Sequence, residues 1–247
     1  MAAHEDRHWW FVGRRAVICA LLDRIDLPER ATILEAGCGT GGNLYMLSER
    51  GTVSAFEPHG EAREFAADKV LAAVLGGSLP SEVPFEPGSF DLVAAFDVLE
   101  HVEADGPALA ALVSMARPGG WVLVTVPAIQ RLWGSHDRRL HHVRRYDPTR
   151  LRRLATDAGA EIAYSTWFNT LLAPLAMTYR VAERIVGRDL GDQERMPPAP
   201  INRVLAWAFG LERHVVGRIP LPIGLSIGMV LRRPAEEEAY ARAIATA

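Results

Sequence analysis

The sequence is poor in several features that would point to common classes of protein. It has two cysteines, Cys19 and Cys38, which are too few for a disulfide framework. Its net charge is −3, so it lacks the basic surplus typical of nucleic-acid-binding proteins. It has no uninterrupted run of about 18 apolar residues, and its start, MAAHEDRHWW, lacks the basic-then-apolar pattern of a signal peptide. We therefore expect a cytoplasmic protein, soluble or peripherally bound at the inner membrane face, with no nucleic-acid partner.

Short apolar runs alternate with helical segments along most of the chain. At 247 residues, 49% of them hydrophobic, the chain is long enough to bury one sizeable core. Strands are expected at 31–37, 52–58, 70–77, 90–98, 121–127, 161–168 and 225–233, and helices at 8–25, 43–50, 60–68, 106–120 and 147–160. Because strands that alternate with helices form sheets covered on both faces, this order predicts an α/β fold with a mostly parallel sheet.

One long segment interrupts this alternation. Roughly 55 residues, 170–225, separate the last two strands, where a handful would suffice. They contain two apolar helical candidates, 171–187 and 201–217, joined by a polar, proline-rich linker. We expect a helical lid at 1–30, a core at 31–169 and 224–234, a helical insertion at 170–223 and a tail at 235–247. The insertion could cap a pocket, form a homodimer interface or lie on a membrane.

A cluster of glycines marks the candidate binding site. The stretch TILEAGCGTGGNL, residues 32–44, has four glycines within six positions between a strand and a helix. Glycine accepts positive φ and lets a ligand approach the backbone, and ligands bind at the carboxyl ends of parallel strands. A purely structural turn would need only one or two glycines. The stretch also fits a dinucleotide pattern with Glu57 as the following acid, but the carboxylate of Glu35 would repel a pyrophosphate and attract an ammonium group.

Five blocks of the sequence resemble class I S-adenosylmethionine (SAM)-dependent methyltransferases, in order and spacing. The first block is ILEAGCGTGG, and VSAFEP resembles the family's second-strand acid. GGSLPSEVPFEPGSFDLVAAFDVLEHV resembles the adenine-side loop and fourth strand, and ARPGGWVLVTVP resembles the fifth-strand block. HHVRRYDPTRLRRLATDAGAEI resembles a block of the bacterial type 11/12 group. The resemblance covers residues 8–168 and the last strand, and implies a Rossmann-like fold with seven strands, helices on both faces, a helical lid and an insertion.

The resemblance also implies where SAM and its product S-adenosylhomocysteine bind. Glu35 would organise the glycine turn and the methionine ammonium, and Glu57 would hold both ribose hydroxyls. Asp97 and Val98 would end the fourth strand beside the methionine half of SAM. The other implied cofactor-binding residues are Gly37, Cys38, Gly39, Thr40, Gly41, Asn43, Pro58, Ser78 and Leu79. Ser78 departs from the family, which often has an aspartate near this position.

The N-terminal stretch HWWFVGRR, residues 8–15, has two readings. Its aromatic residues could anchor the first helix on the sheet. Alternatively the stretch is a lid over the cofactor. In that arrangement Trp10 lies near the sulfonium by cation–π attraction, and Arg15 binds the methionine carboxylate.

Histidines are the candidate general bases, because methyl transfer to a hydroxyl benefits from a base with a pKa near neutrality. His101 follows the fourth strand, and His136 and His142 lie in SHDRRLHHVRRY, residues 135–146. We expect these three histidines to contact or activate the acceptor, although His101 could also only support its loop. The loop 135–146 could likewise be merely solvated and basic.

Two further readings concern the same loops. Ubiquinone-biosynthesis O-methyltransferases show a similar acid-x-x-Glu-His cluster that binds a divalent ion. That cluster would be Asp97, Glu100 and His101 here, although the expected metal content is none. Arg144 or Arg145 could hold an anionic group.

The sequence therefore predicts a SAM-dependent methyltransferase. Its acceptor is expected to be small or lipid-linked, and anionic if the arginines bind it. The expected reaction is O-methylation, ahead of N- or C-methylation. The alternatives are a module that binds SAM or a dinucleotide without catalysis, and a structural protein with a decayed site.

Overall fold

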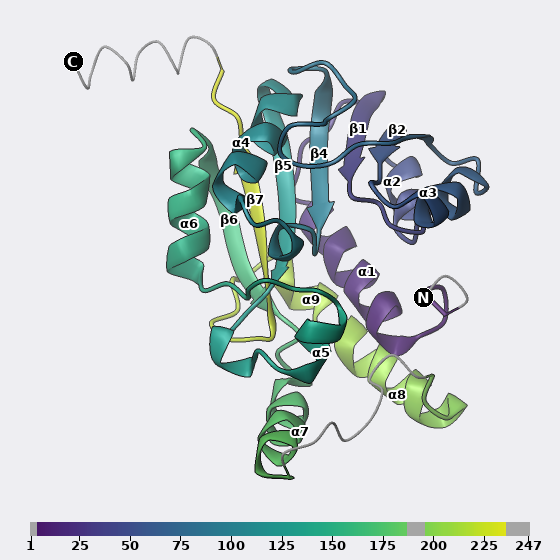
Figure 1. Ribbon diagram of the computed structural model, residues 1–247, viewed down its shortest axis with the longest axis vertical. Helices are drawn as coiled ribbons and strands as arrows, with labels where there is room; N and C mark the ends of the chain where they lie inside the picture. Colours follow the sequence, from purple (N-terminus) through teal and green to yellow (C-terminus); the bar gives the residue numbers. More distant parts are fainter. Residues whose placement is uncertain (1–3, 187–195, 236–247) are drawn as a thin grey trace.

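The computed structural model describes residues 4–186 and 196–235. Its seven strands form one sheet in the order β3-β2-β1-β4-β5-β7-β6 (Figure 1). β1 (Ala31–Ala36), β2 (Gly51–Phe56), β3 (Ala73–Leu75), β4 (Phe90–Phe96) and β5 (Ala116–Pro127) run parallel. β7 (Ser226–Arg232) lies antiparallel between β5 and β6 (Glu161–Phe168). The predicted α/β fold with a mostly parallel sheet is confirmed.

Helices cover both faces of the sheet, because neighbouring residues of each strand point to opposite faces. One face packs against α4 (Asp105–Met115) and α6 (Pro148–Asp157), with Leu34 of β1 in this cluster. The other face, which includes Ile33, packs against α1 (Trp9–Leu22), α2 (Leu44–Ser48) and α3 (Gly60–Ala67). The central strand β4 is buried along its whole length. Both faces of the sheet therefore contribute to the core.

The boundary between α4 and β5 differs from the predicted one. The predicted helix is stopped by Pro118, Gly119 and Gly120, whereas α4 already ends at Met115 and Ala116 pairs with Phe90 of β4. Pro118 cannot continue a helix, and Gly119 adopts a φ of +77° and donates its N–H to the carbonyl of Arg233. The sheet thus extends into a segment whose composition indicates a helix end.

The insertion contributes α7 (Ala173–Val186), α8 (Ala199–Gly210) and the short α9 (Arg213–Val216). α8 lies directly against α1, where a Cβ on Gly13 would come within 2.5 Å of the Phe209 ring. Phe209 is fully buried and stacks on Phe168 of β6 with 6.4 Å between ring centroids. Asn202 of α8 also accepts a hydrogen bond from the Trp9 N–H at 2.8 Å. This half of the insertion is therefore part of the core.

The lid at 1–30 and the insertion at 170–223 stay predictions as separate units. The N-terminal half of α1 faces the cavity described below, while Val17, Ile18 and Leu21 lie in the core. Most of the predicted linker 188–200 and nearly all of the tail 235–247 fall outside the described residues. Within the described ranges, no helix combines the length and apolar character needed to span a bilayer.

Candidate active site

A large cavity opens at the carboxyl ends of β1, β2 and β4. Its volume is about 1220 Å³, whereas sites for one small molecule usually measure about 300–1,000 Å³. The glycine turn after β1 and the segment after β4 form one part of its wall. α1, the loop 135–146 and α7 form the rest. The cavity therefore has room for a cofactor and an acceptor together.

The glycine turn adopts the backbone that its composition predicts. Gly37, Gly39 and Gly41 have φ values of +66°, +56° and +80°, a region that strains other residues. A Cβ on Gly37 would come within 2.9 Å of the Val98 side chain, whereas a Cβ on Gly39 would meet no atom within 4 Å. Gly37 is thus required by packing against the end of β4. Gly39 keeps the cavity open.

Glu57 ties the end of β2 to this turn. Its Oε2 accepts the Gly39 N–H at 2.9 Å, and its Oε1 accepts the His59 N–H at 3.0 Å. A pyrophosphate at this turn would need the same backbone N–H groups, so the arrangement disfavours a dinucleotide. Each carboxylate oxygen has a second lone pair that can accept a hydroxyl. This geometry suits a diol such as a ribose.

Glu35 lies one layer behind the cavity wall. It is 1% exposed, and its Oε1 accepts a hydrogen bond of 2.8 Å from Nδ2 of Asn43, which does line the cavity. Burial raises the pKa of the Glu35 carboxyl to about 7, although the Asn43 hydrogen bond opposes this shift. Glu35 can thus act on a ligand through Asn43 and through its charge, and its direct contact with an ammonium stays a prediction.

Most of the other predicted cofactor residues surround the same cavity. Thr40 lines it and donates its hydroxyl to Glu5 at 2.6 Å, which brings the N-terminal segment onto the turn. Gly41 lies outside the wall and packs against Ala66 of α3. The Ser78 hydroxyl donates a hydrogen bond to Oε2 of Glu82 at 3.0 Å. The remaining predicted residues on the wall are Trp10, Cys38, Pro58, Leu79, Asp97 and Val98.

Sequence reasoning missed Arg14, which lines the cavity beside the end of β4. Arg14 is buried on α1, and its Nη2 lies 2.6 Å from Oδ2 of Asp97 at the end of β4. Its guanidinium carbon also lies 5.0 Å from the centre of the Trp10 ring. Arg15 lines the cavity too, but its Nη1 donates to the carbonyls of Glu5 and Gly42. The signal for Arg14 was its spacing from the apolar positions 17, 18 and 21 on the buried side of the helix.

His142 has the geometry of an oriented base. Its Nδ1 lies 3.0 Å from Oδ1 of Asp137, a fully buried residue that sequence reasoning also missed. Arg145 binds both oxygens of Asp137, through Nε at 2.7 Å and Nη2 at 3.0 Å. Although burial alone would raise the pKa of Asp137, the hydrogen bonds from His142 and Arg145 hold it well below its usual range. The Asp137 carboxylate therefore holds the Nδ1–H tautomer of His142 and leaves Nε2 as the acceptor.

The other two predicted bases lie on the same wall but are weaker acceptors of a proton. Burial and the neighbouring His142 lower the pKa of His101 to about 4. Burial and the nearby Arg180 lower the pKa of His136 to about 4. His101 meets His142 edge to face, with 4.8 Å between ring centroids. A base works best with a pKa near the working pH, and these lowered pKa values therefore weaken His101 and His136 as candidate bases.

Glu100 completes a candidate cation cluster with the same two histidines. Ligand atoms of Glu100, His101 and His142 lie within 4.8 Å of one another. Glu100 is fully buried and, among the described residues, no hydrogen-bond donor reaches its carboxylate oxygens. Burial and the nearby Asp97 raise the pKa of Glu100 well above its usual value. The predicted cluster of Asp97, Glu100 and His101 is only partly assembled, because Asp97 pairs with Arg14.

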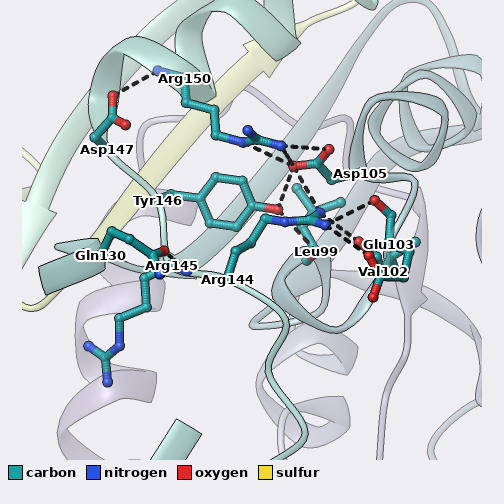
Figure 2. A network of polar contacts seen from close by, with 10 residues as sticks. All are labelled: Leu99, Val102, Glu103, Asp105, Gln130, Arg144, Arg145, Tyr146, Asp147 and Arg150. Atoms are coloured by element: carbon teal, nitrogen blue, oxygen red, sulfur yellow. Dashed lines mark hydrogen bonds and ion pairs between the residues drawn. The ribbon is translucent and has the colours of Figure 1, made fainter. Parts of the chain in front are cut away.

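A second network holds the segment after β4 in place (Figure 2). Asp105 accepts hydrogen bonds from the Tyr146 hydroxyl at 3.0 Å and from Arg150, and Arg144 lies 3.2 Å from it. Figure 2 shows the Arg144 side chain pointing towards Asp105 and the Arg145 side chain pointing away from it. Arg145 instead binds Asp137. Both arginines are engaged inside the protein, and Arg145 also lines the cavity, so their predicted role in binding an anionic group stays a prediction.

A seven-stranded sheet with an antiparallel β7, a glycine turn after β1 and an acid after β2 are together the features of class I SAM-dependent methyltransferases. Residues 11–165 match a family described as methyltransferase domain. That match covers more than half of the chain, and the chain belongs to this family. It is a SAM-dependent methyltransferase, and SAM is its cofactor.

The known proteins that are similar to this chain include two curated relatives and one solved structure. A ubiquinone biosynthesis O-methyltransferase of Thiobacillus denitrificans is 28% identical over 171 residues, 60% of this chain and 72% of that protein. One from Burkholderia cenocepacia is 46% identical over 37 residues, 15% of this chain and only 16% of that protein's length. Geranyl diphosphate methyltransferase, solved with SAM, has a TM-score of 0.59 at 15% identity, over 90% of this chain and 85% of that one. This last likeness shows the fold alone.

Proposed function

We propose that the enzyme methylates a hydroxyl group, with His142 as the general base. The observation that carries this proposal is the buried Asp137–His142 pair, which directs Nε2 of His142 towards the cavity that holds the glycine turn. The names of the ubiquinone biosynthesis O-methyltransferases support the same type of reaction. The predicted non-catalytic module has no use for such an oriented base.

The residues of the chain divide the work as follows. SAM, when bound, supplies an activated methyl group on its sulfonium. We propose that Glu57 holds the ribose and that Arg14, rather than Arg15, faces the methionine carboxylate. His142 accepts the proton of the acceptor hydroxyl as its oxygen forms the bond to the methyl carbon and the carbon–sulfur bond breaks. Trp10 on α1 and the wall formed by α7 keep water out of this arrangement.

The acceptor proposed here is apolar with an anionic group, either small or lipid-linked. Leu172, Leu175 and Ala176, in and just before α7, give the outer part of the cavity an apolar wall. Arg139 and Arg180 line the same part and supply positive charge. Apolar walls with a few placed charges are typical of sites for hydrophobic ligands that carry an acidic group.

A metal-assisted version of the same reaction is the second candidate, because Glu100, His101 and His142 come together. Carboxylate and imidazole ligands suit a borderline divalent cation, and such an ion would lower the pKa of an acceptor hydroxyl. His142 would then be a ligand through Nε2, and the base role would pass to water.

The test uses radiolabelled SAM with a panel of phenols, alcohols, carboxylic acids and amines. We expect product on phenols or alcohols, and we expect His142→Gln to lower turnover by about 10²- to 10⁴-fold with S-adenosylhomocysteine affinity unchanged. His214→Gln, an exposed histidine of α9, is the matched control. Methylation of amines alone, or full activity of His142→Gln, would contradict the proposal. Activity that disappears with EDTA and returns with a divalent ion would select the metal-assisted version.

A further inference from the structure

The outer side of α8 and α9 carries a continuous row of exposed apolar side chains. Leu211 and Glu212, which join the two helices, keep helical φ and ψ, so the helical path continues from one to the other. The residues are spaced by three or four positions and so fall on one side of that path. The row consists of Ile201, Val204, Trp207, Leu211 and Val215, all exposed, and is called the α8–α9 stripe below.

The α8–α9 stripe is not the side of these helices that packs against the rest of the protein. The opposite side of α8 and α9 presents Phe209 and Val216, both fully buried against the sheet and α1. Trp207 in the stripe is 66% exposed. Single exposed apolar residues are ordinary, but a contiguous row of large ones marks an interaction surface.

The exposed charged side chains between residues 196 and 223 are all positive, although Arg213 falls on the side of the helical path that carries Phe209 and Val216. Arg203, Arg213 and Arg218 are exposed between residues 196 and 223. Glu212 is the one carboxylate in that range, and it is buried with its Oε1 accepting the Leu171 N–H at 2.8 Å. A cationic, apolar surface with an exposed tryptophan on a protein of net charge −3 is therefore a local feature of this segment.

We propose that the α8–α9 stripe docks the protein on an anionic lipid bilayer. Apolar side chains of one helix side would enter the boundary between headgroups and acyl chains, while Arg203 and Arg218 would meet lipid phosphates. Tryptophan favours this boundary because its ring is amphipathic. The chemistry recognised is thus a negatively charged lipid surface.

A second copy of the chain fits the stripe less well. Identical subunits related by a two-fold axis place the same patch against itself. Such an interface would bring Arg203 and Arg218 of one copy close to the same arginines of the other, with no exposed carboxylate between residues 196 and 223 to offset them. Like charges across an interface oppose association, so charge favours a lipid surface over a homodimer.

Docking on this side would bring the acceptor half of the cavity close to the lipid. Leu205 of α8 and Leu175 of α7 both line the cavity, and Leu175 is also 61% exposed. α7 and α8 both extend at the lower side of Figure 1, away from β1 to β3. This step rests on the proposed function, because it would give a lipid-linked acceptor a short path from the bilayer to the cavity. The docking itself needs no acceptor.

The experiment measures flotation with vesicles of phosphatidylcholine, alone or mixed with phosphatidylglycerol. The wild-type protein should float with the anionic vesicles and stay in solution with the neutral ones. Trp207→Ser and the double variant Arg203→Glu/Arg218→Glu should each lose flotation. Removing one arginine should lower the partition coefficient by about fivefold, the contribution of one basic residue at an anionic surface.

Matched controls separate this surface from general stickiness and charge. Phe65→Ser removes an exposed aromatic ring of α3, and Arg152→Glu/Arg153→Glu reverses exposed charges of α6. Both should float like the wild type, and all variants should keep thermal stabilisation by S-adenosylhomocysteine as evidence of folding. Absence of wild-type flotation, or equal flotation of stripe and control variants, would overturn the proposal. So would a dimer that Trp207→Ser dissociates without any lipid binding. A stripe variant that no longer floats but still methylates a water-soluble acceptor would leave the proposed function intact.

Discussion

Replacing Glu35 by glutamine should stabilise the ligand-free enzyme and weaken its hold on the cofactor. The Glu35 carboxyl is buried behind the cavity wall, and burial raises its pKa from the ordinary 4.5 to about 7. A raised folded-state pKa contributes stability below pH 4.5, and that contribution is lost as the pH rises through about 7. The shift corresponds to about 3 kcal/mol of unfolding free energy lost across this range. Glutamine keeps the acceptor for Asn43 without the charge.

The assay is urea unfolding of wild type and Glu35→Gln at several values between pH 5 and pH 8. The difference in unfolding free energy should grow with pH and approach about 3 kcal/mol at pH 8, with glutamine the more stable. Comparing the two proteins at each pH removes the contribution of Glu100, whose raised pKa acts in the same direction. A difference that does not change with pH would refute the argument from burial.

Saturation with S-adenosylhomocysteine should reverse this order. Its ammonium group near Asn43 would favour the ionised carboxylate, so the ligand should stabilise wild type more than Glu35→Gln. Isothermal titration at pH 8 should accordingly give a weaker affinity for the variant. Equal affinities would show that Glu35 supports the turn without serving the ammonium.

Two glycine substitutions test the cavity and the packing of the insertion. Gly39→Ala and its control Gly159→Ala both place a methyl group in open space at positive φ. Each should therefore lower the unfolding free energy by about 1–2 kcal/mol. Only Gly39→Ala should weaken S-adenosylhomocysteine binding in a titration. Gly13→Ala should lower the unfolding free energy by about 1–3 kcal/mol by crowding Phe209, whereas Gly210→Ala, with no atom within 4 Å of its added Cβ, should cost no such strain in the same urea assay. If Gly13→Ala had the same unfolding free energy as the wild type, α8 would be able to move away from α1 at no cost.

The cofactor half could be predicted from the sequence because its signals are local. Glycines 37, 39 and 41 show their backbone requirement directly, and each β-strand that precedes a site residue is a short, largely apolar run. The end of α4 could not be placed, because Ala116 pairs with Phe90, 26 residues away in the chain. The composition of residues 116–120 indicates the end of a helix. It carries no information about β4, the strand with which Ala116 pairs.

The base and its partner show the same limit inside the site. His142 was one of three candidate histidines, and nothing in SHDRRLHHVRRY distinguishes it. What distinguishes it is Asp137, which α5 (Ser135–Arg139) turns inward to bind both His142 and Arg145. The missed Arg14 is a different case, because its helical spacing from Val17 and Leu21 already indicated the buried side. The prediction that Arg15 binds the methionine carboxylate does not take this helical periodicity into account.

The two proposed halves of the cavity, one for the cofactor and one for the acceptor, are built from parts of the chain with different constraints. The cofactor half consists of strand ends, the turn at Gly37–Gly41 and α1, all fixed by the core, so a change there alters the fold as well as binding. The acceptor half consists of the loop 135–146 and α7, which meet where Ser135 donates to Glu183 at 3.2 Å. Substitutions in α7 can therefore change the acceptor without disturbing the sheet. α8 packs on α1 through the contact between Phe209 and Gly13. Its other side exposes the α8–α9 stripe. A surface partner on that stripe would therefore act on a helix that contacts α1 and also lines the cavity through Leu205.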